Sequence, residues 1–326
     1  MAETRSVFGE SVRATVTTAR DAVAMLLPFT NKERGAARIH ASLRSFAKPG
    51  TWFAPMWAIM VGAVAAPASR WDLLSLGRIA AAMLMAGPLL CAFSQVVNDY
   101  FDRDVDRINE PDRPTAAGLL APRTVGLIAV SLAVLALLVA ALLGRPVVVL
   151  AALGIVLALA YSVPPLRLKA HDGWLATAAC AFSYEGLAWL AGTAAFGRIT
   201  TGSFVLAGLF SGGAIGLMVL NDFKSVAGDR AMGFRSLPVV LGERKALGVA
   251  ITTINLFQAL AMAYVLANGN WIVAAVMNVL LLAQLPMQRK LARDPLKNAP
   301  WYCASAIPPF CWSMLAAALA VRHGGF

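Results

Sequence analysis

Charged residues are scarce in this 326-residue chain. Asp, Glu, Lys and Arg make up 14% of it, whereas hydrophobic residues make up 59%. With a mean hydropathy of +0.68, this composition excludes an ordinary soluble domain and predicts a polytopic helical membrane protein. Only four cysteines and three histidines are present. They lack metal-ligand spacing, so we expect neither a haem nor a zinc site.

Acidic residues are the rarer of the two charge classes, with 17 against 28 basic residues and a net charge of +11. Twenty-three of the 28 lie in residues 1–48 or in the loops after every second apolar segment and their flanks. The other five are Arg70, Arg78, Arg145, Arg198 and Arg322. The positive-inside rule therefore places the N-terminal tail in the cytoplasm and the C-terminus outside. Because topology explains the net charge, nucleic acid is not an expected partner. Basic loops would also help to hold an anionic substrate.

Nine apolar segments are predicted to span the lipid bilayer. They cover residues 50–67, 76–98, 124–143, 146–162, 174–196, 201–221, 246–267, 270–287 and 302–321. We expect an all-α membrane protein with a nine-helix domain in 49–326, tight hairpins at 144–146 and 268–270, and a cytoplasmic tail in 1–48. No cleavable signal peptide is expected. Residues 11–27 form either an amphipathic helix on the membrane surface or part of a partly ordered tail.

An Asp-rich motif follows the second apolar segment. On an α-helix Asn98, Asp99, Asp102 and Asp106 would fall within an arc of roughly 100°, with Asp104 pointing away. Carboxylates crowded on one face repel each other and lose solvation, which a cation would relieve. A solvated helix end is the alternative interpretation of this motif alone.

A second copy of the motif follows the sixth apolar segment at an offset of 123 residues. Asn221, Asp222, Ser225 and Asp229 correspond to the four residues of the first copy, and only Asp102 changes chemistry, to a hydroxyl. Two acidic faces that each end a span predict a Mg²⁺ site, because Mg²⁺ prefers oxygen ligands and is held by few carboxylates plus substrate phosphates.

Basic residues lie in the loops on the same side. Arg113 and Arg235 follow the two motifs at similar offsets, and Arg167 and Lys169 would share one face of an extended chain, suited to holding a diphosphate. The positive-inside rule also expects such residues here. The proline-containing loop 107–123 is either an ordered flap over the site or a plain connector.

Glu185 stands in the middle of the fifth apolar segment, directly after Tyr184. An ionisable side chain at that depth is costly, so it is a candidate functional residue. A structural carboxyl that is protonated or hydrogen-bonded to a neighbouring helix is the alternative.

These residues resemble the UbiA superfamily of intramembrane prenyltransferases, and within it the chlorophyll and bacteriochlorophyll synthase branch. The resemblance is dense over about residues 48–242. Besides the two motifs it is carried by Lys48-Pro49-Gly50-Thr51-Trp52-Phe53, Ile108-Asn109-Glu110-Pro111, Tyr161-Ser162, Ser183-Tyr184-Glu185-Gly186-Leu187-Ala188-Trp189 and Arg235-Ser236-Leu237-Pro238. One departure is Thr115-Ala116-Ala117-Gly118, where the branch usually has Ile-Pro-Ser-Gly, which puts the substrate preference in doubt.

The resemblance implies a nine-helix bundle whose active site opens to the cytoplasmic side. It also implies Mg²⁺-dependent transfer of a C20 prenyl group, geranylgeranyl or phytyl, from its diphosphate to the propionate of chlorophyllide or bacteriochlorophyllide. The expected location is a bacterial cytoplasmic or intracytoplasmic photosynthetic membrane. Other pigment-biosynthesis or photosystem-assembly proteins are candidate partners.

The resemblance also assigns roles to individual residues. Asn98, Asp102 and Asp106 would bind one Mg²⁺, Asp222 and Asp229 a second, with Asp99 and Asn221 as supporting or shared ligands. Arg113, Tyr161, Ser162, Arg167, Lys169 and Arg235 would neutralise the leaving diphosphate. Tyr184 and Glu185 would contact the acceptor, and Gly186, Gly192, Gly212, Gly213 and Gly216 would leave room for its flat ring. Two alternatives are a related enzyme that prenylates a quinone precursor or haem, and a non-catalytic carrier of pigment or lipid.

Overall fold

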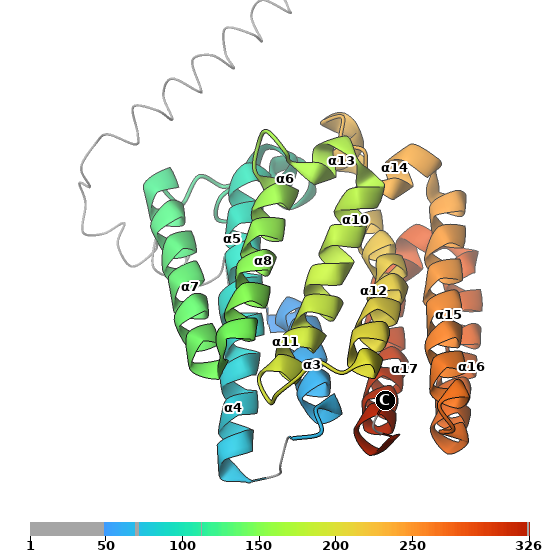
Figure 1. Cartoon of the computed structure of the whole chain (residues 1–326). Coiled ribbons are helices and arrows are strands. Elements are labelled where there is room, and N and C mark those ends of the chain that lie inside the picture. Colours follow the sequence, from blue (N-terminus) through green and yellow to red (C-terminus); the bar gives the residue numbers. More distant parts are fainter. Residues whose placement is uncertain (1–48, 69–71, 112, 325) are drawn as a thin grey trace, which may run out of the picture.

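The structure, a computed structural model, describes residues 49–68, 72–111, 113–324 and 326 and forms a bundle of helices (Figure 1). In chain order the helices are α3 (Pro49–Ala65), α4 (Leu73–Leu84), the π-helix η1 (Met85–Cys91), α5 (Ala92–Phe101), α6 (Arg103–Asn109), α7 (Pro122–Leu143), α8 (Arg145–Ser162), α9 (Leu168–His171), α10 (Gly173–Ala181), the π-helix η2 (Phe182–Leu187), α11 (Ala188–Ala194), α12 (Thr201–Asp222), the 3₁₀-helix η3 (Phe223–Ser225), α13 (Val226–Ala231), α14 (Leu237–Leu241), α15 (Glu243–Ala267), α16 (Trp271–Arg293) and α17 (Pro295–Gly324). The described residues contain no strand.

All nine predicted segments are helical, and the all-α class is confirmed. Within the described part of the chain, seven helices are long and apolar enough to cross a membrane: Leu73–Phe101, Pro122–Leu143, Arg145–Ser162, Thr201–Ala231, Glu243–Ala267, Trp271–Arg293 and Pro295–Gly324. The helix at Gly50–Ala65 is apolar but shorter, and the helix formed by α10, η2 and α11 carries Glu185. The chain is therefore a multi-pass membrane protein. The tail 1–48, with its alternative helix at 11–27, lies outside the described residues.

Local sequence signals explain where several helices begin. The Asp72 carboxylate accepts a hydrogen bond from the Ser75 backbone N–H at 2.8 Å and caps α4, and Asp172 caps α10 in the same way. Prolines in the first turn begin α7 and α8. The expected hairpins are confirmed, because Gly144 alone separates α7 from α8 and residues 268–270 separate α15 from α16.

The core lies around α12, and buried polar groups tie the outer helices to it. In its most apolar window, 61% of the Thr201–Ala231 helix is buried, against 17% for α7, whose surface is left for lipid. Between α15 and α16, Asn255 pairs with Gln288 and Gln258 with Gln284 through reciprocal amide hydrogen bonds of 2.7–3.3 Å. Such pairs fix the register of helices that lipid alone would not order.

The two ends of the bundle differ in chemistry. Figure 1 shows α6, α13 and α14 together at one end and the C-terminus near the other. At the C-terminal end, Arg78 donates to the carbonyls of Leu143 (3.0 Å) and Ala195 (2.6 Å), and Arg322 donates to that of Val64 (3.3 Å). Two of the arginines on this sparsely charged side therefore donate hydrogen bonds to carbonyls of buried residues near helix ends.

Candidate active site

The helix is interrupted at the same position in both Asp motifs. Helix α5 ends before Asp102, which has φ −100° and ψ 2°, and α6 begins one residue later. In the second copy, Ser225 has φ −103° and ψ −2° directly before α13. These residues are 123 positions apart, so the sequence repeat is also a backbone repeat. Each break leads into a short helix, and α6 and α13 contact each other.

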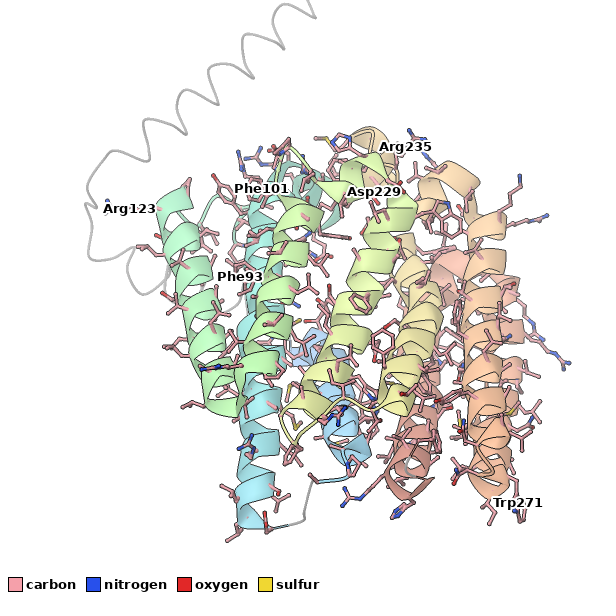
Figure 2. The ribbon with its side chains drawn as sticks, viewed as in Figure 1. Phe93, Phe101, Arg123, Asp229, Arg235 and Trp271 are labelled. Carbon is pink, nitrogen blue, oxygen red and sulfur yellow. The ribbon has the colours of Figure 1, made fainter. Side chains whose placement is uncertain are left out.

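A small polar cavity of about 160 Å³ lies between the two motifs. Its lining includes Asn98, Asp102, Asp106, Asn221, Asp222, Ser225 and Asp229. In Figure 2 Asp229 lies at the same end of the bundle as Phe101 and Arg235, whereas Trp271 lies at the other end. The structure therefore brings together most of the oxygen ligands proposed from the sequence. Asp104 is exposed and pairs with Arg107 at 2.8 Å, away from the cluster as expected.

Arg113 holds the carboxylates of the first motif together. Its Nη1 lies 2.7 Å from Asp106 Oδ2 and 3.1 Å from Asp99 Oδ1, and its other nitrogens bind Glu110 at 2.8 Å. The side chains of Asp99 and Asp106 are only 2% and 8% exposed. Part of the positive charge that this crowded face needs is thus supplied by Arg113, in the loop after α6.

Asp102 is held by two cations from the loop after α8. Lys169 Nζ contacts Asp102 Oδ2, and Arg167 Nη2 lies 3.2 Å from Oδ1 and 2.6 Å from the Phe101 carbonyl. Both cations lie over the Phe234 ring, at 5.8 and 4.7 Å from its centroid. The predicted extended conformation is wrong, because Arg167 has φ +31° and Lys169 lies in the helical turn α9. The cations converge through that turn instead.

Of the other residues proposed to contact the diphosphate, some lie at the polar cavity and others do not. Tyr161 lines the polar cavity, and Ser162 Oγ accepts a 3.4 Å hydrogen bond from Asn98 Nδ2. Arg235 is exposed and, like Arg167, lines neither of the two cavities described here. The Arg235 carbonyl instead packs against Gly173, where an added Cβ would lie 2.2 Å from it.

Burial shifts the pKa of one group in each of the short helices α6 and α9. Desolvation raises the pKa of Asp106 to about 6, although the Arg113 guanidinium opposes the shift. Desolvation also lowers the pKa of Lys169 to about 7, against the attraction of Asp229. Both groups therefore titrate near neutral pH, as groups in functional sites commonly do.

The donor atoms around the polar cavity suit a hard cation. They are carboxylate, carboxamide and hydroxyl oxygens, which Mg²⁺ prefers. Among the described residues, no three Asp, Glu, His or Cys side chains converge into a complete metal cage. This arrangement fits Mg²⁺ that is held by a few carboxylates together with phosphate oxygens of a substrate. The assignment of individual ligands stays a prediction.

A larger cavity of about 540 Å³ continues into the bundle from the polar one, within the size range of small-molecule sites. Five residues line both cavities: Asn98, Arg113, Tyr161, Asn221 and Lys224. Beyond them the walls are mostly apolar and include Ile59, Met85, Leu90, Leu150, Leu157 and Leu187. The arrangement can hold a ligand with an anionic head and an apolar body.

The two proposed acceptor residues differ in their position relative to the larger cavity. Tyr184 lines the larger cavity, but Glu185 does not. Glu185 is 6% exposed, and its Oε2 has no hydrogen-bond partner within residues 49–68, 72–111, 113–324 and 326. Its proposed role stays a prediction, now without a direct contact to the cavity.

The glycines proposed to leave room for a flat ring do not line either cavity, so that expectation is wrong. A Cβ at Gly192 would lie 2.0 Å from the Ile59 carbonyl, and one at Gly216 would lie 2.3 Å from the Ala250 carbonyl. Gly186, Gly212 and Gly213 are similarly crowded by side chains. These residues permit close approach of packed helices, as small residues commonly do in membranes.

Sequence reasoning missed several residues of the site, three of which stand out. Lys224 lines both cavities, and Glu110 and Gln95 line the larger one. The position of Lys224 inside the second motif was a usable signal, and so was Glu110 three residues before Arg113. Gln95 had no sequence signal except its position about one helical turn before Asn98.

Comparison with known proteins identifies relatives of this chain. A family model described as the UbiA prenyltransferase family matches residues 55–315. The bacteriochlorophyll synthase 34 kDa chain of Chloroflexus aurantiacus is 46% identical over 83% of this chain and 87% of its own length. The chloroplastic chlorophyll synthase of Avena sativa is 37% identical over 85% and 75%. A UbiA homologue from Archaeoglobus fulgidus, solved with GPP and Mg²⁺, shares the fold with a TM-score of 0.64 at 18% identity, covering 87% of this chain and 99% of its own.

Proposed function

This chain belongs to the UbiA prenyltransferase family, and we propose that it esterifies the propionate of chlorophyllide or bacteriochlorophyllide with a C20 prenyl group from its diphosphate. Relatives named bacteriochlorophyll synthase and chlorophyll synthase, at 46% and 37% identity, support this acceptor class. The dependence on Mg²⁺ is supported by the oxygen-rich cavity and by the family member solved with GPP and Mg²⁺.

The observation that carries the proposal is the junction of the two cavities. The polar cavity would hold the diphosphate, and the larger one would hold the apolar parts of both substrates. The junction residues Asn98, Tyr161 and Asn221 would then surround the prenyl C1 atom, where the polar and apolar parts of the donor meet. A carrier of pigment or lipid would need no such meeting of acidic and basic side chains.

The reaction breaks the C1–O bond, whose electron pair leaves with the diphosphate, and an oxygen of the acceptor carboxylate forms the new bond to C1. Mg²⁺, when bound, neutralises charge on the leaving diphosphate. Arg113, Lys169 and Lys224 add positive charge at the same end, which favours the transition state over the bound substrate. The acceptor is a carboxylate at neutral pH, so no strong general base is required.

The apolar walls have a second role. They keep water away from C1, where it would otherwise divert the prenyl group to an alcohol. The loop that carries Glu110 and Arg113 would cover the polar end as a flap, which is supported by the presence of Arg113 in the lining of both cavities. Arg113 joins this loop to the first motif, because its Nη1 lies 2.7 Å from Asp106 Oδ2 and 3.1 Å from Asp99 Oδ1.

The topology belongs to the same proposal. Nine membrane crossings, a cytoplasmic opening of the polar cavity, and a cytoplasmic tail in residues 1–48 are supported by the asymmetric distribution of Lys and Arg. The membrane would be the bacterial cytoplasmic or intracytoplasmic photosynthetic membrane. A complex with other pigment-biosynthesis or photosystem-assembly proteins would bring the acceptor to the site.

The test is an acceptor panel. Purified protein is incubated with Mg²⁺ and each of geranylgeranyl and phytyl diphosphate, together with chlorophyllide a, bacteriochlorophyllide a, haem or an aromatic quinone precursor. We expect esters only from the two chlorophyllides. A prenylated haem or quinone precursor would replace the proposal by the related-enzyme alternative, and pigment binding without any product would favour a carrier.

A further inference from the structure

A group of polar side chains lies in the wall of the larger cavity, just below the junction. Thr51, Cys91, Gln95 and Tyr184 line it together. Gln95 Nε2 donates to Thr51 Oγ1 and lies 3.5 Å from Cys91 Sγ, which lies 3.3 Å from the Tyr184 hydroxyl. Helices α3 and α5 and both π-helices supply these side chains, and the residues around them are mostly apolar.

The two π-helices take part in building this group. Cys91 ends η1 and Tyr184 lies in η2, and their side chains meet across the cavity wall. A π-segment adds a residue to a helical turn and so changes the direction in which following side chains point. Such segments occur frequently at functional sites, and here two of them meet at one place.

Gln95 is the member of the group that has an unsatisfied hydrogen-bond acceptor. Among the residues that the structure describes, its buried side-chain carbonyl oxygen, Oε1, has no hydrogen-bond partner, and Gln95 is 8% exposed. Because Nε2 is engaged by Thr51 and Cys91, the amide presents an acceptor that lacks a donor or a cation. A buried carbonyl in this state destabilises the fold, because its desolvation is not compensated, so it points to a ligand.

We propose that Gln95 Oε1 is the axial ligand of the magnesium ion at the centre of the acceptor macrocycle. The inference rests on the proposed function, which supplies a magnesium-containing chlorin as acceptor. Such a magnesium is bound by four ring nitrogens and takes a further ligand on one face of the ring. A neutral amide oxygen is a hard donor that suits Mg²⁺, and the walls beside it, including Leu90, Leu157 and Leu187, are apolar like the ring.

The position of Gln95 agrees with this role. It precedes Asn98 by three residues, which is about 4.5 Å along a helix, and Asn98 lines both cavities. The centre of the ring would therefore lie about one helical turn below the polar cavity. The propionate arm would reach back from there to C1 of the donor. Glu185 Oε2 is also buried without a partner in the described part of the chain, but Glu185 does not line the cavity, so it cannot replace Gln95 in this role.

The experiment compares pigments with and without the metal. The full-length protein in detergent, without prenyl diphosphate, is titrated with bacteriochlorophyllide a and with its magnesium-free form, and the dissociation constants are measured by absorbance. We expect the wild type to bind the magnesium form at least roughly tenfold more tightly. Gln95→Leu should abolish this preference and leave the affinity for the magnesium-free ring nearly unchanged.

Two further variants separate ligation from packing. Gln95→Glu retains an oxygen ligand and should retain the preference. Gln258→Leu removes a buried amide outside both cavities and should also retain it. Should Gln95→Leu fail to fold, Gln95→Asn withdraws the oxygen by one methylene and must lose the preference.

The outcomes distinguish this inference from the proposed function. If the wild type binds both rings equally, or if Gln95→Leu weakens both equally, the ligation is refuted while esterification can still be observed. If the wild type binds neither ring and esterifies neither chlorophyllide, the proposed function itself is refuted.

Discussion

Arg113→Met tests whether this arginine neutralises the first motif. The substitution keeps much of the side-chain volume but removes the charge between Asp99 and Asp106, whose side chains are 2% and 8% exposed. Glu110 is 43% exposed, so water compensates it and its pair contributes little. Removing one partner from a buried ion pair costs about 3–5 kcal/mol, and we expect the free energy of unfolding to fall by this amount at pH 8 in EDTA.

The loss should depend on pH in a defined direction. The pKa of Asp106 is already about 6, above its ordinary value of 3.8, and Arg113 is among the groups that lower it. Without Arg113 the folded state retains the Asp106 proton to higher pH than the unfolded state does. Stability of the variant should therefore decrease as pH rises from about 4 through the folded pKa, and acidification from pH 8 to 6 should recover part of the loss.

The assay is denaturant unfolding in detergent for the wild type, Arg113→Met and the double variant Arg113→Met/Asp106→Asn. The double variant lacks one of the two buried charges, so it should be more stable than Arg113→Met at pH 8. Mg²⁺ should also stabilise Arg113→Met more than the wild type, because the ion can occupy the place of the lost charge. Equal stability of all three proteins in EDTA would refute the reasoning.

Three further predictions concern the motif, its protonation and the topology. Asp229→Asn should lower turnover at least about tenfold at saturating Mg²⁺, whereas Asp104→Asn, an exposed residue whose ion pair in the described part of the chain is with Arg107, should stay near wild type; similar activities of the two variants would contradict a ligand role for Asp229. The Mg²⁺ concentration for half-maximal activity should rise between pH 7.5 and 5.5, because Asp106, with a pKa of about 6, must lose its proton to bind the metal; a constant value would show that Asp106 is not a ligand. A cysteine at the exposed residue Ala117 should be labelled from the cytoplasmic side and one at the exposed residue Arg198 from the opposite side, and labelling of both from one side would overturn the proposed topology.

The fold could be predicted from the sequence because apolar length alone selects helices in a membrane. The recurrence of Asn98, Asp99, Asp102 and Asp106 at an offset of 123 likewise predicted two faces around one polar site. The pairing of Asp102 with Lys169 could not be predicted, because it depends on the helical turn α9 and on the backbone break after Phe101. Neither has a periodic signature.

Other features of the site required the three-dimensional structure. A π-helix has no periodic sequence signature, so the meeting of Cys91 with Tyr184 was not visible in the residue pattern. Gly192 and Gly216 were misinterpreted because a glycine in an apolar helix has the same sequence signal whether it faces a ligand or another backbone. The role proposed for Gln95 was also not visible in the sequence. The orientation of its amide, which leaves the carbonyl oxygen without a donor, depends on Thr51, 44 residues away.

The central claim is that the junction of the two cavities transfers a prenyl group to the acceptor and excludes water. Its most direct test measures both products, with radiolabelled geranylgeranyl diphosphate, bacteriochlorophyllide a and the purified protein. The account predicts one prenyl ester for each diphosphate released in Mg²⁺, with neither product formed in EDTA. Release of diphosphate with prenyl alcohol in place of the ester, or ester formation that continues in EDTA, would contradict it.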